Sequence, residues 1–330
     1  MSLRRRHLLA LSAGASASLA FAPSAALAEA GYPVKPITVV VSYPPGGDTD
    51  AIARLLCDKL SQRLKQPVVI DNRPGAGGAI GNAWVGRAPA DGYTLLFTPN
   101  PFTTAPMVLN LKAGASYDVL HGYEAIIKSA VQPLVLVAHP GTGFKSLADM
   151  TAAVRAGQAV SYASPGAGSP MHVLAEWLNS AANVKVSHVP YRGVGPSVTD
   201  VVAGHVNTAW VTLGPVKQYL AQGKLQALAI GDAQRSALMP EVPTVAEQGY
   251  KEVVVGAWNG FFAPRGTPPE VVRLLNAQLN EILKQAEVIE KLALFGATPV
   301  GGAPAVLART NESDYEVMSR LIKRLGITAE

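Results

Sequence analysis

The sequence predicts an α/β fold with a largely parallel sheet, on three observations. Short runs of β-branched residues alternate with segments in which apolar residues recur at helical spacing, and turns rich in glycine and proline separate the two. The chain has 330 residues, 48% of them hydrophobic and 15% charged, which excludes a disordered chain and allows about two domains of ordinary size. No low-complexity linker divides it, so we expect strands to cross between two domains.

The first elements alternate between strand and helix. Ile37–Val41 is a short β-branched run and predicts a buried strand, which the turn at Tyr43–Gly47 ends. Asp50 is a favourable N-cap for a helix over 51–64. Two further strands are expected at 67–70 and 93–97, with a glycine-rich turn and a short helix between them.

The same alternation continues through the second half of the chain. Ser146 is a candidate N-cap, and Gly204 and Gly223 are candidate helix ends. The pattern predicts strands at 133–137, 159–162, 184–189, 206–211 and 225–230, and helices at 146–156, 170–179, 197–203, 215–222 and 268–294, the last being the longest helical pattern.

Residues 1–28 have the pattern of a cleaved export signal. Arg4, Arg5 and Arg6 form a positive n-region, an apolar core of small and aliphatic residues follows, and Ala26-Leu27-Ala28 fits the cleavage rule. The core is too short and too rich in small residues to predict a membrane anchor. Arg5-Arg6 before His7-Leu8-Leu9 also fits a twin-arginine signal, with the general secretory route as the alternative. We therefore expect the mature chain, from about Glu29, in the periplasm.

Charge and motifs argue against several classes of function. The formal net charge is +5, and three of the positive charges lie in the predicted signal, so the mature chain carries too little charge to predict nucleic-acid binding. The glycine-rich run 75–81 fails the dinucleotide pattern because Ile80 stands at the sixth position, and Ser169 lacks a nucleophile-elbow context. His172 and Glu176 are spaced as two metal ligands without a third nearby, so packing or a surface pair is favoured. We expect no cofactor and no metal, and a buried Cys57 as the only cysteine.

Three predicted loops, at 43–50, 98–104 and 164–169, have the same position between a strand and a helix. Each follows a predicted strand and precedes a helix, so in an open α/β sheet each lies at a carboxyl end, where ligands bind. Glycine N–H groups and helix N-termini together favour a carboxylate. Glycine and proline that merely shape turns remain the alternative interpretation.

A set of short stretches spans essentially the whole mature chain: 32–37, 43–50 with Ala53-Arg54, 72–78, 89–95, 164–169, 188–193, 223–229, 242–244 with Glu247, and 263–268. Each stretch is weak evidence alone, but together and in this order they resemble a known family. These are the Bug receptors of tripartite tricarboxylate transporters, which are periplasmic solute receptors.

The resemblance implies a two-lobed periplasmic binding-protein fold of type II-like form, in which each lobe is a mostly parallel sheet flanked by helices and the ligand lies between the lobes. The first lobe would hold Glu29–Ser129 and Gly256–Glu330, and the second Ala130–Val255. Carried over position by position, the ligand-binding candidates are Pro45, Gly46, Gly47, Asp48, Thr49, Asp50 and Asn100 in the first lobe, and Ser164, Gly168, Ser169, His172, Tyr191 and Thr212 in the second.

Two positions depart from the resemblance. Asp48 stands where the family often has a small uncharged residue, and it would repel a second ligand carboxylate or attract an ammonium or amide group. Asn207 stands where the family often has an aspartate. Aromatic carboxylates, dicarboxylates, amino acids and amides all remain candidate ligands.

The leading hypothesis is a non-catalytic, monomeric receptor that binds a small carboxylate and delivers it to the membrane permease subunits of a tripartite tricarboxylate transporter. One alternative is an exported α/β enzyme acting on a carboxylate, with His172 or Asp50 as base, although the sequence shows no recognisable nucleophile–base pair. A third is a sensory co-receptor for a membrane kinase, which would use the same closure.

Overall fold

The computed structural model describes residues 31–328, and the predicted export signal lies outside them. A first sheet has the strand order β11-β4-β10-β3-β1-β2. Its core strand β1 pairs in parallel with β2 and β3, whereas β10 runs antiparallel to β3 and β4, as does β11 to β4. Its strands are β1 (Ile37–Val41), β2 (Val68–Asn72), β3 (Thr94–Pro99), β4 (Tyr123–Gln132), β10 (Ala257–Pro264) and β11 (Thr298–Pro299).

A second sheet has the order β7-β6-β8-β5-β9. β6 pairs in parallel with β7 and β8, and β5 runs antiparallel to β8 and β9. The strands are β5 (Leu134–Ala138), β6 (Ser161–Ser164), β7 (Ser187–Pro190), β8 (Thr208–Thr212) and β9 (Gln226–Ile230).

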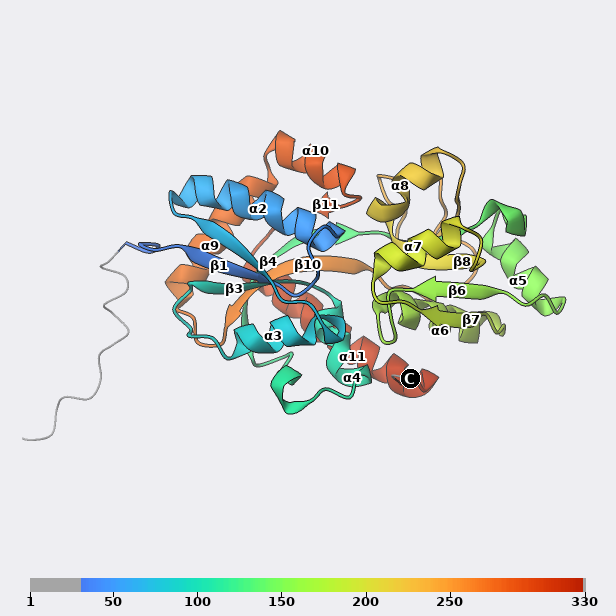
Figure 1. Cartoon of the computed structure of the whole chain (residues 1–330), viewed down its shortest axis with the longest axis horizontal. Coiled ribbons are helices and arrows are strands. Elements are labelled where there is room, and N and C mark those ends of the chain that lie inside the picture. Colours follow the sequence, from blue (N-terminus) through green and yellow to red (C-terminus); the bar gives the residue numbers. More distant parts are fainter. Residues whose placement is uncertain (1–30, 329–330) are drawn as a thin grey trace, which may run out of the picture. The chain divides into compact units, whose positions relative to one another are not determined.

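Both sheets are therefore mixed rather than mostly parallel, which corrects the prediction. Only Pro133 separates β4 from β5, so the chain passes straight from the first sheet into the second (Figure 1). The parallel strands β6 and β8 end toward the first sheet, and a strand that arrives from there must run against them. β10 returns between β3 and β4 and runs antiparallel to both for the same reason.

The helices cover both faces of each sheet. Figure 1 shows α2 and α10 on one side of the first sheet and α3 and α4 on the other. The helices are α2 (Asp48–Leu64), α3 (Ala79–Gly86), α4 (Pro101–Val108), α5 (Leu147–Arg155), α6 (Pro170–Ala182), α7 (Val194–Val202), α8 (Leu213–Ala221), α9 (Pro269–Leu283), α10 (Ala286–Leu294) and α11 (Pro304–Leu325).

Side chains of β5 alternate between two hydrophobic cores. Leu134 and Leu136 pack into the core that α5 and α6 cover, whereas Val135 and Val137 pack into the core under α7 and α8. This alternation is the period-two pattern of a strand buried on both faces. It explains why the run at 133–137 is continuously apolar.

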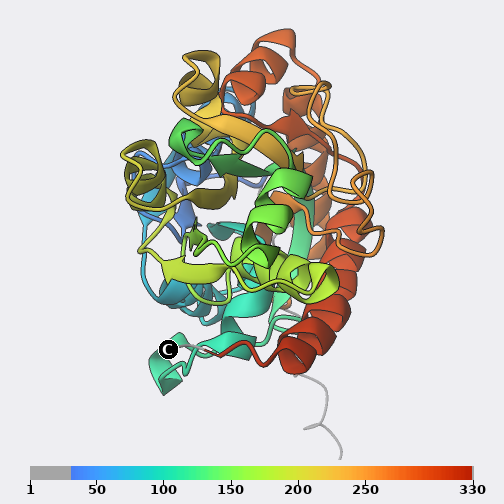
Figure 2. The same ribbon diagram turned by 90° about the vertical axis from the view of Figure 1, so that its right-hand side faces the viewer.

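Two helix predictions need correction. The pattern over 268–294 is two helices, because the extended backbone of Gln285 ends α9 and begins α10. The buried stripe continues from Leu279 and Ile282 to Val288 and Leu292, so the periodicity conceals the break. Among residues 31–328 the longest helix is α11, with 22 residues, which runs along one side of the molecule in Figure 2.

The C-terminal part of α11 belongs to the core of the second sheet. Met318, Leu321 and Ile322 are buried in the same hydrophobic cluster as Leu134 and Leu174. The residues after 256 therefore stabilise both sheets, and the lobe boundaries stay a prediction.

Candidate functional site

The two sheets meet through the carboxylate of Asp48, the first residue of α2. Its Oδ2 accepts hydrogen bonds from Thr212 Oγ1, at the carboxyl end of β8, and from Gln132 Nε2, at the end of β4, both at 2.9 Å. Its Oδ1 accepts from the backbone N–H of Thr49 at 2.9 Å. Asn259 in turn donates to Gln132 Oε1 at 2.8 Å. Two of the sequence-predicted site residues, Asp48 and Thr212, are thus in direct contact although 164 positions separate them.

Asp50 holds the turn before α2, and its predicted role as N-cap is wrong. The helix begins at Asp48, three residues earlier than predicted, with Gly47 at the N-cap in an extended conformation. From inside the first turn, Asp50 accepts hydrogen bonds from Gly46 N (2.9 Å), Arg54 Nε (2.8 Å) and Asn72 Nδ2 (2.9 Å). Burial acts to raise its pKa, but these bonds prevail and lower it below the usual value.

The other first-sheet candidates differ in exposure. Pro45, Gly46 and Gly47 are exposed at the tip of the turn, whereas Thr49 is buried beneath it. Asn100 is buried at the end of β3, where its Nδ2 donates to Gly256 O at 2.9 Å and its N–H to Trp258 O at 3.1 Å. Asn100 therefore holds the segment in which the chain returns to the first sheet.

The loop between β6 and α6 is held by its own polar groups. Ser169 is the N-cap of α6: its Oγ accepts from His172 N at 3.3 Å and donates to Gly166 O at 2.7 Å. Gly168 N donates to His172 Nδ1 at 3.0 Å. Gly168 has a φ of +73°, and a Cβ there would lie 2.6 Å from Val108 Cβ of α4, so both the backbone conformation and the Val108 side chain favour glycine.

A stack of aromatic rings lies behind this loop. His188 stacks on His172 with ring centroids 3.9 Å apart and on Tyr162 at 4.9 Å, and its Nε2 lies 2.7 Å from Ser164 Oγ. Burial lowers the pKa of both imidazoles to about 4, and for His172 the neighbouring His188 adds to the effect. Both rings are therefore neutral near pH 7.

Sequence reasoning missed His188 as part of this cluster. The parallel register of β6 and β7 places it opposite Tyr162, and the predicted strand at 184–189 was the signal that could have located it. His172 and Glu176 do not face each other as a pair of metal ligands, which was the less favoured interpretation of their spacing. Glu176 Oε1 instead accepts from Tyr162 Oη at 2.6 Å.

Tyr191 turns its hydroxyl toward α7. It donates to Asp200 Oδ2 at 2.5 Å, and burial together with Asp200 raises the pKa of Tyr191 to about 12. Asn207 lies before β8, at the opposite end from Thr212, and its Oδ1 accepts from Ser161 N at 2.9 Å. Asn207 is therefore a structural residue at the amino end of the strands, away from the predicted loops.

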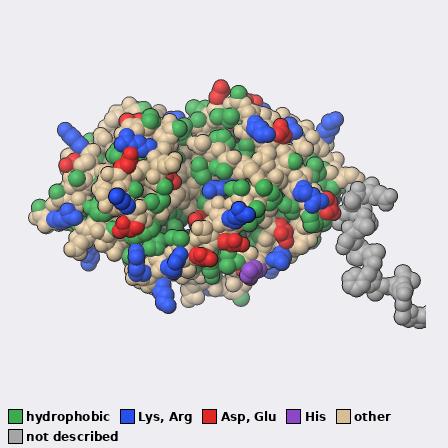
Figure 3. Space-filling view, turned by 180° about the vertical axis from the view of Figure 1, so that it is seen from behind, with side chains coloured by type: hydrophobic (Ala, Val, Ile, Leu, Met, Phe, Trp, Pro, Cys, Tyr) green, Lys and Arg blue, Asp and Glu red, His purple; other side chains and the backbone are tan. Residues whose placement is uncertain are grey.

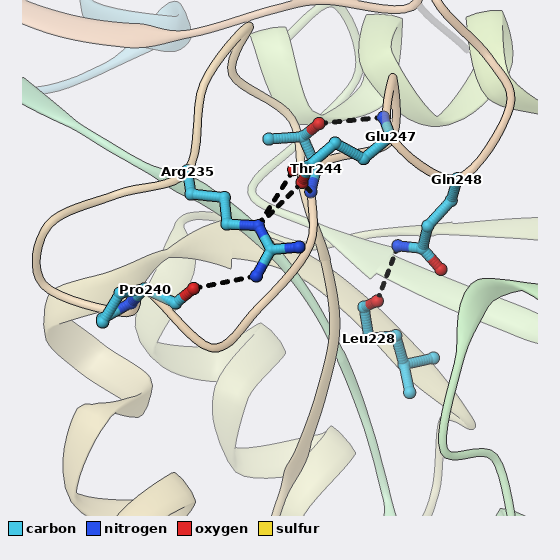
Figure 4. Close-up of polar contacts among 6 residues, drawn as sticks. All are labelled: Leu228, Arg235, Pro240, Thr244, Glu247 and Gln248. Atoms are coloured by element: carbon cyan, nitrogen blue, oxygen red, sulfur yellow. Dashed lines mark hydrogen bonds and ion pairs between the residues drawn. The ribbon is translucent and has the colours of Figure 1, made fainter.

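A separate cavity of about 310 Å³ lies beside β9 and the start of α5. Figure 4 shows the bonds that shape the neighbouring loop: Arg235 Nε contacts both carboxylate oxygens of Glu247 at 2.9 and 3.0 Å, and Gln248 Nε2 donates to Leu228 O at 3.0 Å. Glu247 also accepts from Thr244 N at 2.7 Å. None of the sequence-predicted site residues lines this cavity, so it is distinct from the strand-end loops.

The side chains of the described residues limit the kinds of ligand that the site can bind. Within residues 31–328 no three His, Cys, Asp or Glu side chains gather as metal ligands would. No helix in that part of the chain is long and apolar enough to span a bilayer. On the face drawn in Figure 3, Lys and Arg side chains lie scattered among acidic ones. The strand-end loops offer hydroxyls and helix N-termini, which suit a small anion.

Comparison with known proteins identifies the family of the chain. The family described as "Tripartite tricarboxylate transporter family receptor" matches residues 52–327. Protein BugT of Bordetella pertussis is 39% identical over 276 residues, which cover 83% of this chain and 84% of BugT.

Two solved structures share the fold across nearly the whole chain. Rpa4515 of R. palustris, solved with adipate, has a TM-score of 0.83 and 30% identity, and covers 91% of this chain and 100% of its own. MatC of Rhodopseudomonas palustris, solved with bound malate, has a TM-score of 0.79 and 31% identity, and covers 88% of this chain and 100% of its own. The predicted periplasmic binding-protein fold and family resemblance are confirmed.

Proposed function

Since the chain belongs to the family of tripartite tricarboxylate transporter receptors, we propose that it is an extracytoplasmic receptor that binds a small organic carboxylate and delivers it to the permease subunits of such a transporter. The observation that carries the proposal is the meeting of strand-end loops from two sheets at Asp48 and Thr212. Ligands of α/β sheets bind at the carboxyl ends of the strands, and the dipoles of α2, α6 and α8 favour an anion there. Bound adipate and malate in two structural relatives support a carboxylate.

We propose that the predicted site residues act in two ways. Asp50, Asn100, Ser164, Gly168, Ser169, His172 and Tyr191 position the loops, because their polar atoms bond to groups of the same or a neighbouring loop. The remaining candidates would face the ligand, directly or through water. They are Pro45, Gly46, Gly47, Asp48, Thr49 and Thr212, of which Asp48 and Thr212 bond to each other between the two sheets.

The family is one of solute receptors, and we propose that this member has no enzymatic activity. Ser164 and His188 form the pair closest to a nucleophile and base, at 2.7 Å. Both the lowered pKa of His188 and the complete burial of Ser164 oppose catalysis near neutral pH, since a base of pKa about 4 accepts a proton poorly there. The same argument applies to His172, and the lowered pKa of Asp50 makes it a weak base.

We further propose that the chain is exported to the periplasm, with cleavage near Ala28, and acts as a monomer. The crossings between its lobes would lie near Pro133 and Gly256, where strands leave one sheet for the other. Ligand binding would close the lobes by bending these few residues.

A thermal-shift and calorimetric screen of protein purified from the periplasm tests the proposal. We expect one or more small carboxylates to bind stoichiometrically and to be recovered unchanged. A ligand at 100 times its Kd adds about 2.7 kcal/mol of apparent stability. Turnover of a bound compound that is lost in His172→Ala or Ser164→Ala would contradict the receptor and favour an enzyme.

A further inference from the structure

Asp48 is a charged side chain at the junction of the two sheets. Its three hydrogen-bond donors, Thr212 Oγ1, Gln132 Nε2 and Thr49 N, are all neutral groups. They come from the end of β8 in the second sheet, from the end of β4 in the first sheet, and from α2. Thr212 and Gln132 are buried, so the bonds hold the carboxylate at one place between the strand-end loops.

The negative charge of Asp48 has no cationic partner among the described residues, where no Lys, Arg or His forms an ion pair with it. Asp50, two residues away, differs in this respect because Arg54 pairs with it at 2.8 Å. A carboxylate can accept about four hydrogen bonds, and Asp48 receives three. One acceptor position remains for a further partner, and the charge is offset only by these neutral donors and by the N-terminus of α2.

We propose that Asp48 determines ligand specificity: it selects a carboxylate whose other end carries an ammonium group and rejects dicarboxylates. This inference rests on the proposed receptor function. The ligand carboxylate would lie among the hydroxyls and helix N-termini of the strand-end loops, and its far end would approach the free acceptor position of Asp48. An ammonium group there forms a charge-assisted hydrogen bond, whereas a second carboxylate meets a like charge in a partly buried setting.

A purely structural role for Asp48 makes a different prediction. If the carboxylate only joins the two sheets, its replacement would weaken the binding of every ligand by the same factor. A selecting role changes the ratio between ligands that differ only in the charge of one end. The ratio is therefore the quantity to measure.

Two matched sets of ligands isolate that charge: succinate, 4-aminobutanoate and butanoate, and adipate, 6-aminohexanoate and hexanoate. Affinities are measured by isothermal titration calorimetry for the wild type, Asp48→Asn and Asp48→Ser. Asp58→Asn is the matched control, since it removes a carboxylate from the exposed side of the same helix. Thermal unfolding of each variant establishes that it is folded.

We expect the wild type to bind the amino acid of at least one set roughly 10- to 100-fold more tightly than the diacid, the size of one charge contact in a partly screened site. Asp48→Asn and Asp48→Ser should bring this ratio close to one, and Asp58→Asn should leave it unchanged. If Asp48→Asn fails to fold, Asp48→Ser carries the same test.

A wild type that binds succinate or adipate at least as tightly as the matched amino acid would overturn the role of Asp48 and leave the receptor function intact. The same holds if the ratio survives in both Asp48 variants. Failure of all six compounds, and of the wider panel of organic acids, to bind would overturn the receptor function and this inference with it.

Discussion

Polar side chains around the strand-end loops mostly bond to the protein itself. Ser169 uses its hydroxyl to cap α6 and to hold Gly166 O, and Asp50 uses both oxygens on Gly46, Arg54 and Asn72. These bonds fix the loop backbones before any ligand arrives. A preorganised loop loses less entropy on binding, so such residues contribute to affinity without touching the ligand.

Replacing Ser169 by Ala tests this division of roles. Loss of the N-cap should lower the free energy of unfolding by about 1 kcal/mol. Because the hydroxyl proton is already donated to Gly166 O, we expect the affinity for a carboxylate to fall less than about tenfold, or 1.4 kcal/mol. Urea unfolding and calorimetric titration measure the two quantities.

Ser146→Ala is the matched control, since Ser146 caps α5 in the same way through Asp149 N. It should cost similar stability and leave affinity unchanged. A larger loss of affinity in Ser169→Ala than tenfold would mean that the hydroxyl contacts the ligand.

The two stacked imidazoles predict a dependence of stability on pH. Their pKa of about 4 in the fold lies below the ordinary 6.5, so the unfolded chain binds more protons as the pH falls below 6.5. The free energy of unfolding should therefore be nearly constant above pH 7 and fall as the pH is lowered from 6.5 toward 4. Urea unfolding at several pH values measures it.

Substitution of one ring separates this effect from the titration of carboxylates. His172→Gln should reduce the slope of the profile between pH 6.5 and 4 and leave the share of His188, whereas His121→Gln should not, because the His121 side chain is exposed. Parallel profiles for the wild type and His172→Gln would be evidence against a neutral His172 in the fold.

At the scale of elements, α11 connects the two sheets. Its first turns carry Leu307, which packs in the core of the first sheet, and its last turns carry Leu321 and Ile322, which pack in the core of the second. One rigid helix thus contributes to both cores. It is a link between the sheets in addition to the chain crossings near Pro133 and Gly256.

Ile322→Ala should lower the free energy of unfolding by about 2–5 kcal/mol, the usual cost of truncating a large buried aliphatic side chain. The residue is 6% exposed and packs with the apolar side chains of β5 and α6. Val306→Ala, on the exposed side of the same helix, is the control and should change stability by less than about 0.5 kcal/mol. Equal effects of the two substitutions would contradict the packing of α11 on the second sheet.

At the scale of the whole molecule, one carboxylate joins parts of the chain that fold as different sheets. Asp48 contacts Thr212 and Gln132, and Gly168 lies against Val108 of α4. These contacts bring the loops of both sheets together around the proposed ligand position. The function that follows from them also requires that the chain leave the cytoplasm.

Replacing Arg5 and Arg6 together by Lys tests the export route. If the twin-arginine pathway is used, the precursor should accumulate in the cytoplasm, because that pathway reads the arginine pair. Fractionation and immunoblotting measure its distribution. Normal periplasmic accumulation would exclude the twin-arginine route and favour general secretion.

Local sequence patterns determined much of this protein. The β-branched run at Ile37–Val41 forms β1 with the predicted bounds, Ser146 caps α5, and Cys57 is buried. The segments 43–50, 98–104 and 164–169 do lead from strands into helices, as predicted, although α2 and α4 already begin at Asp48 and Pro101, and the family motifs identified the fold. Such features depend on residues near one another in the chain, so periodicity and turn chemistry reveal them.

Tertiary structure alone decided which of these loops touch. The bond between Asp48 and Thr212, the stacking of His172 on His188 and the antiparallel entry of β5 and β10 all depend on how distant strands pair and how the sheets meet. The sequence wrongly predicted Asp50 as the N-cap and 268–294 as one helix. Residue propensity and apolar spacing do not determine at which residue the backbone leaves the helical conformation. Only packing selects among backbone paths that satisfy the same local pattern, since the free energy that decides comes from contacts between residues far apart in the chain.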